Sequence, residues 1–150
     1  MDLPVWQSLY EELKDDGFTV LAVAMDSRGA EAARPWIERA SPGYDCLIDQ
    51  EHHVAELYNM VNVPQAVWID EEGRIVRPTE VAGSNDAFRA MDRSDFSIPD
   101  AQAEKIAQGR AVYLDALRDW VVKGAASEFV SQGDDVRARQ PAPDDTVALA

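Results

Sequence analysis

The apolar run at residues 18–24, Phe-Thr-Val-Leu-Ala-Val-Ala, constrains the fold of this chain more than any other segment. It is too short for a stable helix, it is rich in β-branched residues, and it is apolar on both faces of an extended strand. Such a run is typical of a buried parallel strand. Helical patterns precede and follow it, at residues 3–16 and 30–40. The sequence therefore predicts an α/β fold built from alternating helices and strands.

The other predicted elements follow from the same kind of pattern. The helix at 3–16 places its apolar residues at three- and four-residue spacing and ends at Gly17. Gly73 supplies the turn of an antiparallel hairpin. Parallel strands joined by helices and closed by a hairpin predict one mixed sheet with flanking helices. The further strands are expected at 44–48, 66–69 and 74–77, and the further helices at 52–60 and 100–124.

Composition changes twice in the second half of the chain. Residues 79–98 are polar and weakly periodic, so we expect a loop with one helical turn. Beyond Val130 the sequence is rich in Gln, Gly, Asp and Pro, which is typical of a linker. Asp145 and Thr146 then resemble the cap of a further helix. We expect one domain over residues 1–130, and a linker with the start of a cropped element over 131–150.

Charge and hydropathy exclude several classes of partner. The formal net charge is −14, and no stretch gathers Lys and Arg, so neither nucleic acid nor an anionic membrane surface is an expected partner. No window is long and apolar enough for a membrane span, and no signal peptide precedes the first helix. These features slightly favour a cytoplasmic location for the chain as written, while a longer chain would leave an extracytoplasmic location open. The oligomeric state is not indicated.

Few residues carry obvious chemistry. Cys46 is the only cysteine, so the chain can form neither an intramolecular disulfide nor a cysteine-based metal cage. It lies on a predicted strand, where a small buried hydrophobic role is favoured over a peroxidatic or resolving one. His52 and Glu56 are one helical turn apart, but two ligands do not make a metal site. We expect no metal and no cofactor.

Five blocks in a fixed order resemble one family. The order of the blocks carries the resemblance, since no single motif would suffice, and the most specific block is Val-Pro, strand, Asp-Glu-Glu-Gly, strand. Over residues 1–80 the chain resembles the ResA/TlpA-type thioredoxin-like proteins, neighbours of the AhpC/TSA peroxiredoxins. The blocks are Leu3-Pro4 with Leu9–Leu13, Gly17–Val23, Cys46–Asp49, Tyr58–Pro64 and Val67–Val76.

The resemblance implies a substrate site at Val63, Pro64 and Gln65. In the family the matching proline is cis and stands beside the active-site disulfide, where the backbone before it pairs with an extended substrate. It therefore implies an extended peptide or a protein disulfide as partner. From the residues alone, a trans proline at a loop-to-strand boundary is the alternative, because cis bonds are a minority even before proline.

The chain departs from the family where the chemistry should be. Members carry a Cys-x-x-Cys motif at the start of the helix that matches residues 3–16, directly after a central strand. Nothing in the 150 residues replaces this motif, so no catalytic residue is assigned. We expect that the chain is truncated after the redox motif and is inactive as given. An upstream selenocysteine, with its UGA codon read as a stop, would place the start at Met1.

Two functions from different classes remain. The first is a thiol-disulfide oxidoreductase or peroxiredoxin-like domain whose cysteine or selenocysteine lies upstream of Met1. The second is a non-catalytic thioredoxin-like module that binds peptides or acts as an adaptor. The missing central strand argues against the second, because a parallel sheet without it leaves two exposed edges.

Overall fold

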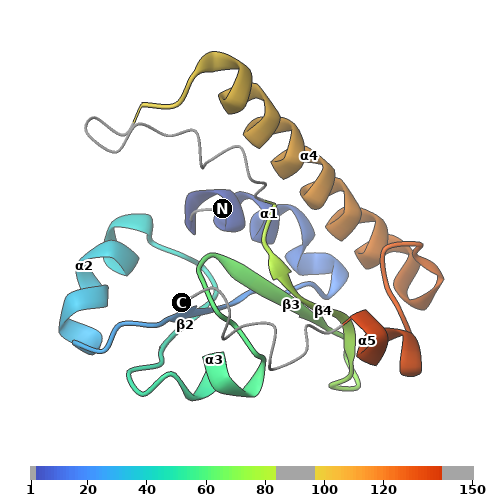
Figure 1. Cartoon of the computed structure of the whole chain (residues 1–150), viewed down its shortest axis with the longest axis horizontal. Coiled ribbons are helices and arrows are strands. Elements are labelled where there is room, and N and C mark those ends of the chain that lie inside the picture. The colour runs from blue at the N-terminus through green and yellow to red at the C-terminus, as the bar shows by residue number, and fades with distance from the viewer. Residues whose placement is uncertain (1–2, 84–96, 140–150) are drawn as a thin grey trace.

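A computed structural model describes residues 3–83 and 97–139 of the chain (Figure 1). The fold is α/β, as predicted, and short 3-10 turns extend α1 and α4. The element boundaries lie within a few residues of those predicted from periodicity. In chain order the elements are α1 (Leu3–Leu13), β1 (Leu21–Ala24), α2 (Ala30–Ala40), β2 (Asp45–Ile48), α3 (His53–Leu57), β3 (Gln65–Ile69), β4 (Ile75–Val81), α4 (Asp100–Lys123) and α5 (Asp134–Arg139).

The strands form two separate pairs and not the single mixed sheet that the sequence predicts. β1 pairs with β2 in parallel, with Leu21 opposite Asp45, and β3 pairs with β4 in antiparallel orientation, with Gln65 opposite Val81. Within the described residues no strand connects β1 to β3. The periodicity of a strand predicts which of its faces are apolar but not which neighbour takes its hydrogen bonds.

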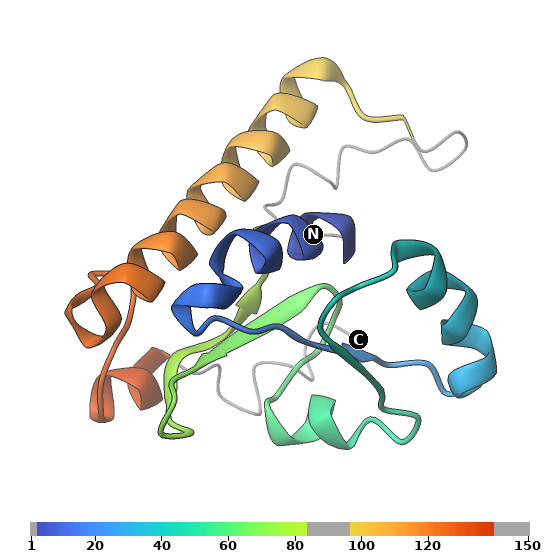
Figure 2. The same ribbon diagram turned by 180° about the vertical axis from the view of Figure 1, so that it is seen from behind.

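The two pairs are unequally packed. α1 and α4 lie together on one side of the β3–β4 pair, and α3 lies on the other side (Figures 1 and 2). The buried core joins α1, β3, β4 and α4, and it contains no residue of β1 or β2. Its members are Leu9, Leu13, Trp68, Val76, Ala82, Tyr113, Ala116 and Leu117.

An aromatic cluster forms the centre of this core. Trp68 of β3 stacks on Trp120 of α4, with ring centroids 5.1 Å apart. Its Nε1–H donates a hydrogen bond of 2.8 Å to the hydroxyl of Tyr113. The guanidinium of Arg77 lies 4.7 Å from the Trp68 ring centroid, a cation–π contact. These contacts attach β3 and β4 firmly to α4.

The hairpin turn has a local explanation. One carboxylate oxygen of Asp70 accepts hydrogen bonds from the backbone N–H groups of Glu72 and Arg74, and Gly73 adopts a φ of +77°, which favours glycine. β4 then continues to Val81, four residues beyond the predicted end. The register shifts beside Pro78, where a bulge accommodates a residue that cannot donate. The rest of the predicted loop, at 84–96, lies outside the described residues.

The chain beyond Val130 contains a helix that the composition did not predict. In α5 the side chain of Val136 is buried, and the backbone N–H of Ser131 donates to the carbonyl of Val76 at 2.7 Å. Residues 131–139 therefore pack against β4. Residues 140–150, where the further cropped element is predicted, lie outside the described residues, so the proposed division at residue 130 stays a prediction.

Candidate functional site

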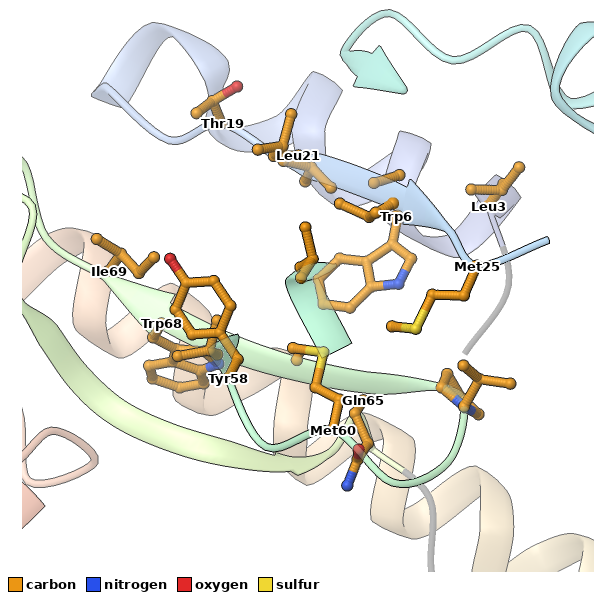
Figure 3. A pocket seen from close by; sticks show the side chains of 18 of the residues that line it. Leu3, Trp6, Thr19, Leu21, Met25, Tyr58, Met60, Gln65, Trp68 and Ile69 are labelled. Atoms are coloured by element: carbon orange, nitrogen blue, oxygen red, sulfur yellow. The ribbon is translucent and has the colours of Figure 1, made fainter. Parts of the chain in front are cut away.

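A largely apolar groove with a volume of about 860 Å³ separates the two strand pairs. β1 and β3 contribute to its walls, together with the start of α1, part of α2, and the segment from α3 to β3. Figure 3 shows Leu21 and Ile69 on opposite walls, with Trp6 between them. The strand of residues 18–24, predicted to be buried, is in fact short and partly open: Leu21 is 59% exposed.

The predicted substrate residues lie in the wall of this groove. The Val63-Pro64 peptide bond is cis, which confirms that prediction, and the Val63 side chain is 70% exposed. The Pro64 carbonyl accepts a hydrogen bond from the backbone N–H of Ala82 at 3.2 Å. β4 therefore holds the loop at a fixed position. A substrate role for these residues stays a proposal.

Gln65 has a structural use that the sequence did not reveal. Its side-chain oxygen accepts a hydrogen bond of 2.8 Å from the backbone N–H of Val61. On the next strand, the hydroxyl of Thr79 donates to the Tyr58 carbonyl at 2.6 Å. These two bonds shape the segment that leads into the proline, so the Gln65 side chain stabilises the loop itself.

The first turn of α1 faces the same groove. Leu3, Pro4 and Trp6 belong to its wall, and Pro4 is tolerated because the first turn of a helix leaves its N–H groups unpaired. The hydroxyl of Tyr44 donates to the Leu3 carbonyl at 3.2 Å. The structure thus brings the N-terminal end of α1 and the Val63-Pro64 loop to one cavity, although they are some sixty residues apart.

Cys46 lies elsewhere. It is on β2, opposite Ala22 of β1, and it is not among the groove residues. Its side chain is half-buried, less covered than the predicted small hydrophobic residue. Burial raises the pKa of the thiol, and the neighbouring charge of Asp45 raises it further. A raised pKa lowers the fraction of thiolate, which is the reactive form.

The histidine and acidic residues after β2 serve the start of α3. The buried carboxylate of Asp49 accepts hydrogen bonds from the backbone N–H groups of His53 and Val54, at 2.9 and 2.8 Å. Burial acts to raise the Asp49 pKa, but these N–H bonds outweigh it and hold the pKa below its ordinary value. Residues 3–83 and 97–139 contain no cluster of three or more potential metal ligands.

Comparison with known families decides the assignment. The AhpC/TSA family matches residues 2–77, about half of the chain. The chain belongs to the AhpC/TSA family. The matched range of this AhpC/TSA chain runs from α1 into β4 and includes the proline loop, whereas α4 and α5 lie beyond it. No curated protein and no solved structure matches the chain.

Membership places the chain among the thioredoxin-like peroxiredoxin proteins and suggests a thiol redox domain. The α/β arrangement, with its cis proline before β3, is consistent with a thioredoxin-like fold. No helix in the described part of the chain has the length and hydropathy of a membrane span.

The groove itself was not predicted from the sequence. All four tryptophans of the chain, Trp6, Trp36, Trp68 and Trp120, line it, yet they come from α1, α2, β3 and α4. The signal that could have found it is the run at 18–24, which is apolar on both faces and so requires a covered neighbour on each side.

Proposed function

We propose that this chain is the body of a ResA/TlpA-type thioredoxin-like redox domain that exchanges disulfides or reduces peroxides. Its reactive cysteine or selenocysteine would precede α1 in a longer polypeptide. One observation supports this most strongly: the N-terminal end of α1 and the Val63-Pro64 loop share one groove. A thiolate at that helix end would be stabilised by the helix dipole and would face a substrate held at the loop.

The chemistry assigns distinct tasks to the two parts. The upstream thiolate would attack one sulfur of a substrate disulfide, form a mixed disulfide and release the other sulfur as a thiolate. With a peroxide, the thiolate would take one oxygen to become a sulfenate and release an alcohol or water. An external dithiol would then supply the two electrons that restore the thiol. The chain's own Val63, Pro64 and Gln65 would bind the extended substrate.

Cys46 is a poor candidate for the nucleophile. It lies on β2 outside the groove, and the pKa of its thiol is raised by burial and by Asp45. Replacing it should therefore leave any redox activity of a longer protein unchanged.

The test begins with the DNA upstream of Met1, translated in frame with UGA allowed as selenocysteine. The extended protein is assayed with a dithiol donor, against insulin disulfides and against hydrogen peroxide. We expect turnover from the extended protein, none from the 150-residue chain, and none when the upstream Cys or selenocysteine is replaced by Ser. The matched control, Cys46→Ser in the extended protein, should keep full activity. The redox proposal fails if no frame supplies a strand with a Cys or selenocysteine, or if the upstream Ser variant remains active.

The alternative is a non-catalytic peptide-binding or adaptor module. The exposure of Val63 beside the cis proline favours it, because an exposed apolar side chain at the groove wall can contact a ligand without any thiol. Peptide binding that Val63→Asp abolishes, in an extended protein without redox turnover, would select this function.

A further inference from the structure

Two strand edges without a partner strand face the same groove. Within the described residues β1 pairs only with β2, and β3 pairs only with β4. Leu21–Val23 of β1 and Gln65–Ile69 of β3 are nevertheless walls of one cavity (Figure 3). An unpaired strand edge presents N–H and C=O groups to any extended segment that reaches it. A single inserted strand could therefore hydrogen-bond to both edges.

The lining of the groove indicates the chemistry of such a strand. Although the chain has a net charge of −14, Arg39 is the only charged residue that lines the groove. Leu21 is 59% exposed and Ile69 is 39% exposed, so both walls offer apolar surface to an occupant. Helices flank the strand pairs on both sides, as Figures 1 and 2 show. A strand placed here would be covered on both faces and would need to be apolar throughout.

The start of α1 indicates where the strand comes from. Leu3, the first residue of this helix, lies in the groove wall, so a strand joined to α1 needs only a short connection to reach the cavity. α1 is followed directly by β1. A strand, helix and parallel strand in succession form a right-handed crossover that places the two strands side by side in one sheet. Such a strand would run parallel to β1, in the gap between β1 and β3.

We propose that this groove is the acceptor site for one extended apolar strand, supplied by a segment joined to the N-terminal end of α1, which unites the two strand pairs into a single five-stranded sheet. β1 has four residues and β3 has five, so a strand of about five or six residues, a common strand length, spans both. The acceptor site requires no thiol, so it goes beyond the proposed redox function and stands or fails separately.

The first experiment uses a strand without cysteine. An apolar, β-branched six-residue strand with flanking lysines is fused before Met1 through a short Gly-Ser linker, and the control fusion has Pro at the two central positions. We expect the strand fusion, but not the Pro fusion, to melt several degrees higher and to slow amide exchange in both β1 and β3. Because every tryptophan lines the groove, its fluorescence should also shift to the blue. Equal behaviour of the two fusions, or exchange unchanged in β1 and β3, would overturn the proposal.

The second experiment tests the walls with the same strand as a separate peptide, titrated into the 150-residue chain and followed by tryptophan fluorescence. Leu21→Lys and Ile69→Lys place a charge on each wall at side chains that are already exposed, and each should weaken binding about tenfold or more. The matched control is Leu47→Lys on β2, which is 49% exposed and does not line the groove, and it should bind as the parent does.

Other occupants give distinct results. If sedimentation shows a dimer that Leu21→Lys dissociates, and neither fusion nor peptide changes the groove, the occupant is a second copy and the proposal is wrong. Equal weakening by Leu47→Lys would likewise show that the peptide does not bind in the groove. Since the test strand carries no thiol, failure of the redox assay leaves these outcomes unaffected.

Discussion

Cys46 shows how its local environment limits the reactivity of a thiol. The side chain is half-buried on β2, and burial, followed by the charge of Asp45, raises its pKa. We expect a thiol reagent at pH 7 to label Cys46 slowly in the native chain and faster in denaturant, because only the thiolate reacts. Since folding raises this pKa, the associated stability is complete below the unfolded pKa and is lost as pH rises through the folded one. Equal labelling rates in the two states would show an exposed thiol.

The hydrogen bond between Trp68 and Tyr113 is the other residue-scale feature with a measurable consequence. Both side chains are buried, and Tyr113→Phe leaves the Trp68 N–H without its acceptor. We expect the free energy of unfolding to fall by about 1–3 kcal/mol, measured in urea. Tyr58→Phe, at a half-buried position on the groove wall, should cost less. An equal loss in the two variants would contradict a special role for this bond.

The same tyrosine makes a prediction about alkaline pH. Burial raises the pKa of Tyr113 to about 12. Because the unfolded pKa is about 10, the stability that this group contributes is complete below pH 10 and is lost as pH rises toward the folded value. The difference in stability between the parent and Tyr113→Phe should therefore shrink between about pH 10 and 12. A constant difference across this range would mean that Tyr113 titrates as an exposed tyrosine does.

At the scale of elements, α5 tests whether the chain beyond Val130 belongs to the packed structure. Val136 is 7% exposed, and α5 packs against β4. Val136→Ala should lower the free energy of unfolding by about 1–2 kcal/mol, through lost apolar contact and the remaining cavity. Val122→Ala on α4, at a position that is 81% exposed, should change it by less than about 0.5 kcal/mol. Indistinguishable urea midpoints for these variants would return residues 131–139 to the linker that composition predicted.

At the scale of the whole molecule, the two strand pairs should differ in stability. The buried core contains residues of α1, β3, β4 and α4, but none of β1 or β2. Local opening is easiest where few apolar side chains are buried. Native-state hydrogen exchange should therefore be faster in β1 and β2 than in β3 and β4. Similar protection of the two pairs would show that β1 and β2 are held by more than the described core.

Much of the candidate site was accessible from sequence because its signals are local. The Val-Pro step, the Asp70–Gly73 turn and the apolar run at 18–24 each lie within a few residues, and the resemblance to a family supplied the cis peptide that the structure contains. The shared groove was not accessible, because its walls come from segments as far apart as Leu3 and Trp120. The bond from Gln65 back to Val61 was missed because a side-chain rotamer decides it.

The sequence by itself determined the kinds of element and their order, because helix and strand periodicities and turn residues act over a few positions along the chain. Only the tertiary structure decided that the strands form two pairs, that residues 131–139 pack on β4, and that the start of α1 meets the proline loop. Each of these depends on which distant surfaces come together. An apolar face specifies that it must be covered, whereas hydrogen bonding and shape at the contact select what covers it.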